Sequence, residues 1–293
     1  MEERAGSIGL SPGTLKYIFP DNGGLRDDDV DAAKKLGIDA QIVTDIHVGA
    51  SGALNEAANL FDRHAEFLQS AVNLETNAGT HTHKRALQEA ADLNDFFNAP
   101  AETQRRVLAR TASFCTSRSG HFDAFDQGIS FFLPNMTWMQ PPGHVHAMIA
   151  STRQWNALEL DLDPGMFPAL GAHYANEASA TPSSSKFSAS AQSSDSKDVI
   201  VVRVVNPLAQ PIGPNGTMPV ELKVELDPAA GCTKCTAHSL SHHDVAAANP
   251  SWAPDFISPE VVPCSVTDGT SVILPLSEFS YTIVEFTGCK ARM

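Results

Sequence analysis

The sequence predicts an α/β region followed by an all-β domain. In the first half of the chain, apolar runs of strand length alternate with amphipathic helical segments, as in a parallel β/α array. A stretch rich in Ser and Ala, residues 174–198, then interrupts this pattern. Beyond it, short β-type runs are separated by Pro, Gly and Asn, which is typical of an antiparallel sandwich. We therefore expect an α/β domain at 1–155, a connector at 156–198 and a β-sandwich at 199–293.

Four strand–helix units account for the α/β region. The expected strands are 14–19, 40–48, 71–74 and 128–133, and the expected helices are 27–36, 53–61, 83–97 and 101–111. Acidic residues at 27–29 favour a helix start, because they are stabilised at the positive end of the helix dipole, and Gly37 suits the helix end. Its apolar face is expected to hold Val30, Ala33 and Leu36. Alternating units of this kind form parallel sheets with right-handed connections.

The β-domain is expected to contain shorter strands. Runs rich in β-branched and other apolar residues cover 199–205, 220–226, 271–274 and 281–286. A further run at 187–191 has the length of an edge strand, although it lies inside the Ser- and Ala-rich stretch.

The composition excludes two classes of partner. The formal net charge is −14 at pH 7, so nucleic acids and anionic membranes would be repelled. Neutral ligands such as sugars carry no such penalty. No run approaches the roughly 18 to 20 apolar residues of a membrane span. The N-terminus also lacks the apolar segment of a signal peptide.

The strand expected at 71–74 ends abruptly in polar residues, and the first of them is Glu75. In a β/α fold, a carboxylate just past the C-terminal end of a strand faces the crevice in which ligands bind. Asn77 and His81 follow closely in the sequence. An isolated glutamate at a strand end is more often simply solvated, so these residues alone leave both interpretations open.

Two sets of motifs are similar to one known family. The first set is 120–126, 131–138 and 140–148, which resembles the last barrel strand of the α-L-arabinofuranosidases of glycoside hydrolase family 51. The second set resembles the β-sandwich that closes those enzymes, and it consists of 199–207, His243-Asp244, Asn249-Pro250 and 274–284.

The resemblance implies a retaining glycosidase on a (β/α)8 TIM-type barrel, of which this chain holds the last four β/α units before the sandwich. In such enzymes the acid/base carboxylate ends strand four and the nucleophile ends strand seven. Counting back from 128–133 as the last strand makes Glu75 the candidate catalytic nucleophile. The resemblance implies that an arabinofuranosyl or related glycosyl substrate contacts His47, Asn77, His81, Asn135 and Trp138. It implies neither a cofactor nor a metal.

For two of these residues, a structural role is an alternative to substrate binding. His47 is equally consistent with capping a loop, and Trp138 with ordinary packing.

The chain departs from the family in one respect. Only four β/α units precede the sandwich, whereas this barrel needs eight. The family's Asn-Glu acid/base pair has no clear counterpart, because Asn55-Glu56 lies in an expected surface helix. The acid/base therefore lies outside this chain, either in a missing N-terminal segment or in another polypeptide. Alternatively, the chain is a non-catalytic carbohydrate-binding or scaffold subunit derived from a glycosidase.

Several features stay open at this level. The family suggests a secreted or lysosome-like protein, whereas the chain as given begins without a signal peptide, so the localisation is undetermined. The sugar specificity and the oligomeric state are equally undetermined.

The cysteines and histidines offer weaker motifs. Five cysteines leave at least one unpaired within the chain. Cys232 and Cys235 have zinc spacing with histidines nearby, but a disulfide or plain thiols fit an isolated CxxC better, and pairing of either with Cys264 would suit an oxidising compartment. Two His-x-His pairs, 81/83 and 144/146, fall at or within expected helices.

Two triplets have the N-glycosylation sequence. They start at Asn135 and Asn215, and they are meaningful only in a secreted protein. The triplet at Asn249 is excluded by Pro250.

Overall fold

The computed structural model describes part of the chain. The described residues are 7, 9, 17–18, 26–38, 42–45, 70–73, 81–98, 107–110, 117–118, 129–161, 187–207, 209, 212–213, 216–217, 220–227 and 230–290. The chain divides into two compact units, one of residues 1–77 and 100–113 and the other of residues 78–99 and 114–293. The expected α/β domain, 1–155, is therefore shared between both units.

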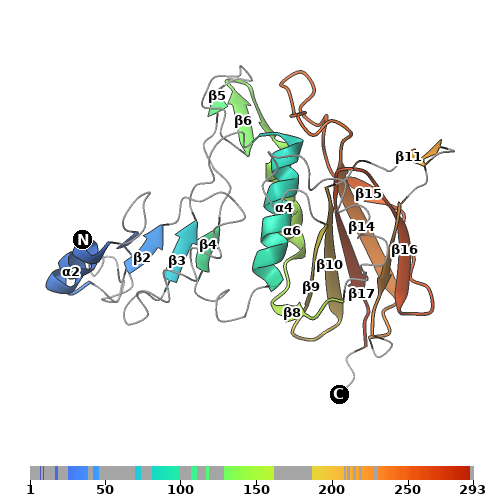
Figure 1. Ribbon diagram of the computed structural model, residues 1–293, viewed down its shortest axis with the longest axis horizontal. Coiled ribbons are helices and arrows are strands. Elements are labelled where there is room, and N and C mark those ends of the chain that lie inside the picture. The colour runs from blue at the N-terminus through green and yellow to red at the C-terminus, as the bar shows by residue number, and fades with distance from the viewer. Residues whose placement is uncertain are drawn as a thin grey trace. The chain divides into compact units, whose positions relative to one another are not determined.

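The first unit holds a four-stranded parallel sheet. Its strands follow the chain order and are β1 (Tyr17–Ile18), β2 (Ile42–Asp45), β3 (Ser70–Asn73) and β4 (Val107–Arg110). The register pairs Asp45 with Val72 and Asn73 with Arg110, so the carboxyl ends of β2, β3 and β4 are nearly level. Figure 1 shows these three strands side by side. The parallel sheet predicted from the alternating pattern is thus present.

Helix α2 (Asp27–Leu36) follows β1 and has the predicted ends. The Asp29 carboxylate accepts hydrogen bonds from the backbone N–H and the guanidinium of Arg26, both at 3.2 Å, which closes the N-terminus. Gly37 ends the helix with φ of 66°, a conformation that glycine adopts at low cost. Val30 and Ala33 are buried as expected, but Leu36 is 72% exposed.

Two expected elements are wrong in type or place. Residues 101–111 were expected to form a helix, but 107–110 form β4, because this short apolar run pairs with β3 and periodicity cannot separate the two states over such a length. The strand expected at 128–133 is β6 (Ser130–Leu133), and it belongs to the second unit. It pairs in parallel with β5 (Ser117–Arg118) and forms a hairpin with β7 (Met136–Met139). The helix expected at 53–61 lies outside the described residues.

The second unit is organised on a six-stranded antiparallel sheet in the order β15-β14-β17-β10-β9-β8. In chain order these strands are β8 (Asn156–Leu158), β9 (Ser188–Ser193), β10 (Val199–Asn206), β14 (Lys234–Ser241), β15 (Glu260–Val262) and β17 (Ser280–Thr287). Two small sheets accompany it, namely β11 (Ile212–Gly213) with β12 (Gly216–Thr217), and β13 (Val220–Glu225) with β16 (Ser271–Leu276).

One face of the six-stranded sheet packs against β13 and β16. Side chains alternate along β10, and Ile200, Val202 and Val204 point to this side. They share a buried cluster with Val272 and Leu274 of β16 and with residues of β9, β14 and β17. The expected runs at 199–205, 220–226, 271–274 and 281–286 therefore all form strands around one hydrophobic core.

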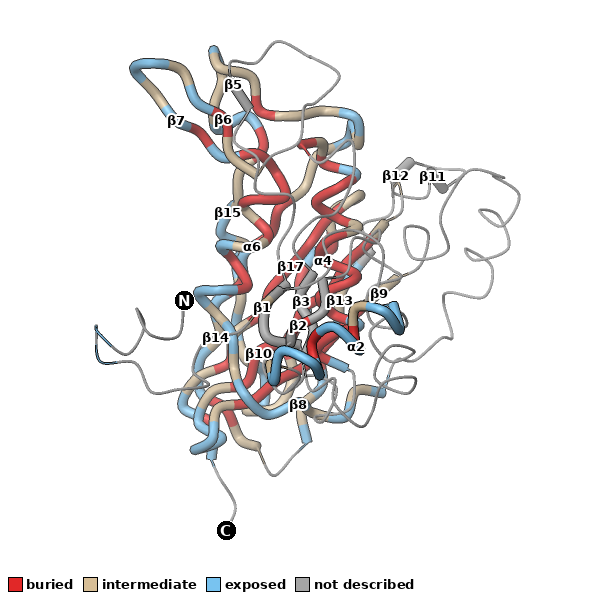
Figure 2. The backbone as a smooth tube through the Cα atoms, turned by 90° about the vertical axis from the view of Figure 1, so that its left-hand side faces the viewer, coloured by how far each residue is buried: buried red, intermediate tan, exposed pale blue. Residues whose placement is uncertain are grey.

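The opposite face is covered by α4 (His83–Asn98) and α6 (Pro141–Thr152). Figure 1 shows α4 running beside this sheet, and in Figure 2 the tubes of α4, β10 and β17 are largely buried. The apolar face of α4, Ala86, Ala90, Leu93 and Phe97, is buried here. Ser190 of β9 donates to Asn94 at 2.7 Å, which satisfies polar groups between helix and sheet.

Arg203 is a fully buried cation on this helix-covered face. Its guanidinium donates to Gln192 Oε1 and to the Thr152 carbonyl, each at 2.9 Å, and lies 4.9 Å from the centre of the Phe97 ring. Burial lowers its pKa, because desolvation disfavours the charged form. The planar fork thus ties β10, β9 and the end of α6 together.

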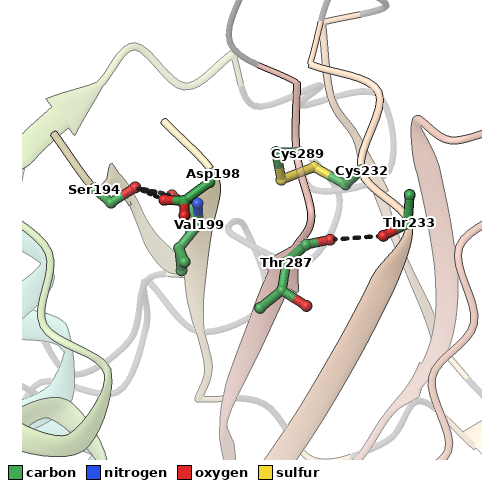
Figure 3. Close-up of a disulfide and its surroundings, with 7 residues drawn as sticks. All are labelled: Ser194, Asp198, Val199, Cys232, Thr233, Thr287 and Cys289. Carbon is green, nitrogen blue, oxygen red and sulfur yellow. Dashed lines mark hydrogen bonds between the residues drawn. A yellow bond between two sulfur atoms is a disulfide. The ribbon is translucent and has the colours of Figure 1, made fainter. Parts of the chain in front are cut away.

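Two disulfides close one end of the second unit. Cys232 is bonded to Cys289, and Cys235 to Cys264. Figure 3 shows the first bridge beside Thr233, whose hydroxyl donates to the Thr287 carbonyl. One of the pairings considered from the sequence, Cys235 with Cys264, is present, whereas the partner of Cys232 was not anticipated. Cys115 lies outside the described residues.

We expect Arg203→Lys to lower the free energy of unfolding by about 1–3 kcal/mol, because a lysine cannot reach both acceptors and leaves buried polar groups unpaired. Urea denaturation would measure this change. Arg153→Lys is the matched control, since Arg153 is exposed, and it should be nearly neutral. Equal effects of the two substitutions would contradict the role assigned to the buried fork.

Reduction of the two disulfides is expected to lower the free energy of unfolding by about 2–4 kcal/mol per bridge, because each bridge restricts the unfolded chain. Urea denaturation with and without reductant would measure the difference. Cys115→Ser should leave the response to reductant unchanged. Non-reducing peptide mapping that recovers neither pairing would refute the assignment.

Candidate functional site

The strongest candidate, Glu75, follows the described strand β3. Glu75, His47 and Asn77 lie outside the described residues. The strands that lead to them are described: β2 ends at Asp45, two residues before His47, and β3 ends at Asn73, two residues before Glu75. Because these strands are parallel neighbours with level ends, the chain leaves both at the same edge of the sheet.

The other three predicted residues belong to the second unit. His81 is 9% exposed, and its ring centre lies 5.9 Å from that of Phe131 on β6. Phe131 in turn contacts Trp138 of β7 edge to face, with the ring centres 5.9 Å apart. The structure therefore brings the rings of His81 and Trp138 into contact with the same phenylalanine.

Trp138 and Asn135 have opposite environments on the β6–β7 hairpin. The Trp138 side chain is 5% exposed, and its indole N–H donates to the Asn249 carbonyl at 2.7 Å. Packing, the alternative weighed from the sequence, is thus the role that the described contacts support for Trp138. Asn135 is exposed in the two-residue turn between the strands.

Asn249 is a connecting residue that the sequence did not single out for this role. Its side-chain amide donates to the Met139 and Ile257 carbonyls at 2.9 Å each, and its Oδ1 accepts from the Ile257 N–H at 2.7 Å. Its backbone pairs with the Gln140 side chain in both directions, at 3.0 and 2.9 Å. The β6–β7 hairpin, the start of α6 and the 250–257 loop are therefore joined through the side chain and backbone of one buried residue. An asparagine before a proline is the only sequence signal for it.

A charged cluster lies between α4 and α6. Glu89 is fully buried, and its carboxylate lies 2.6 Å from the Arg85 guanidinium and 3.9 Å from the His146 ring. The two residues of the same helix are one turn apart, which is the spacing of a helical ion pair. Because this carboxylate is buried against a paired arginine, we regard it as structural.

His83 anchors the first turn of α4. Its Nε2 lies 2.6 Å from the Phe279 carbonyl, and its backbone N–H donates to the Ala247 carbonyl at 2.8 Å. Burial lowers its pKa to about 4, the hydrogen bond to Phe279 opposes this shift, and His242 adds to it. His83 is thus a neutral donor at ordinary pH, and it satisfies the carbonyl of the residue just before β17.

The described residues contain no group of three or more metal-ligating side chains. Cys232 and Cys235 are held in disulfides, so their sulfurs are not available as thiolate ligands. The second His-x-His pair, 144/146, lies within α6 as expected. Among the residues that the structure describes, no helix has both the length and the apolarity to cross a membrane.

A cavity of about 730 Å³ lies between the six-stranded sheet and β13. Its wall is mainly apolar, with Ile200, Val202 and Leu222 among the lining residues, and charged side chains such as Glu225 and Lys290 also line it. Of the candidate residues that the structure describes, His81, Asn135 and Trp138, none lines this cavity, so it gives no support to the roles predicted for them.

Comparison with known proteins bears on the fold alone. The sequence matches no protein-family model and no curated protein. The fold is similar to the family 51 α-L-arabinofuranosidase from Thermotoga petrophila, with a TM-score of 0.61 and 12% identity, over 97% of this chain and 60% of that one. The family 51 arabinofuranosidase from Xanthomonas axonopodis pv. citri gives a TM-score of 0.56 and 13% identity, over 97% and 61%.

A second glycosidase family is also similar. The family 30 xylanase from Clostridium acetobutylicum gives a TM-score of 0.50 and 12% identity, over 98% of this chain and 58% of that one. The chain thus spans about three fifths of the length of these three structures, and 42% of another arabinofuranosidase. The chain has a glycosidase-like fold.

The pH dependence of stability should report the buried His83. Because its pKa is lower in the folded than in the unfolded chain, stability is complete above the unfolded pKa of about 6.5 and is lost as the pH falls towards 4, by on the order of 3 kcal/mol. Denaturation at pH 7, 5.5 and 4 would measure this loss.

His83→Gln should remove this part of the pH dependence, because glutamine does not titrate. His238→Gln replaces an exposed histidine on β14 and should leave the stability at pH 7 unchanged. An unaltered pH profile in His83→Gln would contradict the assignment.

Proposed function

We propose that this chain is the C-terminal part of a retaining glycosidase that cleaves terminal α-L-arabinofuranosyl or related residues. Glu75 is the nucleophile, and the acid/base is supplied from outside the chain. The observation that carries the proposal is the level parallel edge formed by β2, β3 and β4, with Glu75 two residues beyond β3. The likeness of the fold to family 51 and family 30 glycosidases supports it.

In this proposal, the parallel sheet is the second half of a (β/α)8 barrel, and the antiparallel sheets with β13 and β16 are its closing β-sandwich. The last barrel strand is then β4 rather than the run at 128–133. Since β3 is the neighbour of β4, β3 becomes the seventh strand and Glu75 keeps its place at the nucleophile end. The corrected strand count therefore reaches the same residue.

The chemistry requires two carboxyl groups on opposite sides of the glycosidic bond. One protonates the leaving oxygen, and the other attacks the anomeric carbon from about 5 to 5.5 Å away to form a glycosyl-enzyme that water then hydrolyses. Glu75 has the position for the second role. His47 would leave the adjacent strand end, where it can contact a substrate hydroxyl, and Asn77 completes the proposed subsite of the first unit.

Two further properties belong to the same proposal. The partner is a neutral carbohydrate, which an acidic chain does not repel. Because two disulfides persist only where thiols are not kept reduced, the protein works in an oxidising compartment.

Glu75→Gln is expected to lower hydrolysis of an aryl α-L-arabinofuranoside by at least about a thousandfold, because the covalent intermediate cannot form. The assay uses the natural protein at its full mass, measured by intact mass spectrometry, so that any acid/base outside this sequence is present. Proton NMR of the first product should show retention at the anomeric carbon.

Glu260→Gln is the matched control, since Glu260 is exposed on β15 of the second unit, and it should keep full activity. Loss of activity in Glu75→Gln with unchanged folding supports the proposal. Sugar binding without hydrolysis by the natural protein would instead support a non-catalytic carbohydrate-binding subunit. Full activity in Glu75→Gln would refute Glu75 as the nucleophile.

A further inference from the structure

We propose that Asn135 is an N-glycosylation site, with an oligosaccharide attached to its side-chain nitrogen. The triplet Asn135-Met136-Thr137 has the acceptor sequence, with no proline at its centre. The acceptor sequence alone occurs often by chance. Two structural observations, the geometry of the hairpin and the disulfides, raise it to an assignment.

The first observation is the position of the acceptor on the β6–β7 hairpin. Leu133 pairs with Met136, so Pro134 and Asn135 form the two-residue turn, and Asn135 is exposed at its tip. Among the residues that the structure describes, none hydrogen-bonds to the Asn135 amide. A turn that projects from its sheet is accessible to an enzyme that must grip the backbone on both sides of the acceptor.

The acceptor and the hydroxyl of its triplet are both exposed. Trp138 of β7 is buried, whereas Thr137 and Met139 on the other face of the strand are exposed. Asn135 precedes this strand in the turn and is exposed as well. The Thr137 side chain, whose hydroxyl a glycosylation enzyme must recognise, is therefore not turned into the core.

Asn249 provides an internal contrast. Its triplet ends in Ser251, but Pro250 stands at the centre. The Asn249 side chain is 2% exposed, and its amide nitrogen and its amide oxygen are both hydrogen-bonded. Asn215, the acceptor of the third triplet, lies outside the described residues. Of the described acceptors, Asn135 alone combines an allowed triplet with an exposed amide.

The second observation is the pair of disulfides. Bridges from Cys232 to Cys289 and from Cys235 to Cys264 form in oxidising compartments, and in eukaryotic cells the lumen that oxidises cysteines also attaches asparagine-linked sugars. The disulfides and the acceptor turn lie on different elements of the second unit. They are therefore independent indications that the chain passes through this lumen. This inference does not depend on the glycosidase proposal.

The attachment consumes an oligosaccharide carried on a lipid diphosphate. The Asn135 amide nitrogen attacks the anomeric carbon of the first sugar and forms a C–N bond. The bond from that carbon to the diphosphate oxygen breaks, and the leaving lipid diphosphate takes the electron pair. The amide nitrogen gives up one proton, so no oxidant or reductant is needed.

A glycan at Asn135 would also decide between two uses of this residue. A bulky, solvated oligosaccharide cannot share the amide with a bound substrate. Occupancy at Asn135 would therefore remove it from the substrate contacts that the family resemblance implies and leave Glu75 untouched, so the two proposals fail separately.

The test is secretion of the full chain from eukaryotic cells behind a cleavable signal sequence, with Asn215→Gln present throughout to remove the third triplet. Intact mass is measured before and after treatment with peptide N-glycanase. We expect a loss of mass in this parent and in Thr137→Ser, which keeps the hydroxyl. We expect none in Asn135→Gln and Thr137→Ala.

Mass spectrometry of the peptide that contains Asn135 is the second measurement, and it needs only the parent protein even if a variant is not secreted. A glycan on that peptide supports the proposal. Secreted parent protein with both disulfides formed and an unmodified Asn135 overturns it. An unmodified Asn135 in secreted protein whose two disulfides have not formed also overturns it.

Discussion

The six-stranded sheet of the second unit must bury both of its faces, and most of that unit follows from this requirement. Along β10, Val202 points to the small β13–β16 sheet and Arg203 to the helices, so neither side can remain open to water. The helix side carries polar groups, and α4 meets them with its own polar side chains. Helix α4 follows β3 in the sequence, yet its packing assigns it to the second unit.

The sequence predicted the parts of the fold that have strong periodicity or composition. The valine-rich β10 was predicted because a strand that is buried on both faces is a continuous apolar run. The amphipathic α4 was predicted because a helix that is buried on one face has apolar residues at helical spacing. Strand β4 was mistaken for a helix, since four residues cannot show a period. Strand β14 was not foreseen, because its Thr, His and Ser residues are polar and its place is set by pairing with β17.

The residues of the candidate site also differ in whether the sequence can predict them. A glutamate just after an apolar run of strand length is visible in a sequence, and so Glu75 could be proposed; its role stays a prediction. The role of Asn249 was not visible, because its four side-chain and backbone partners lie at 138–140 and at Ile257, and only folding brings the first segment beside it. Low identity to the similar glycosidases means that the shared fold must be separated from shared chemistry. The chemistry therefore has to be argued from individual carboxylates.

The central position of β17 affects the order in which the chain matures during synthesis. Strand β17 lies between β14 and β10 but is the last of the six to leave the ribosome, so the sheet cannot close until residues 280–287 have been synthesised. Cys264 emerges earlier and can oxidise with Cys235 on the nascent chain. Cys232 must wait for Cys289, 57 residues away in sequence. Until then its nearest cysteine is Cys235, and premature pairing within the CxxC would have to be undone by exchange.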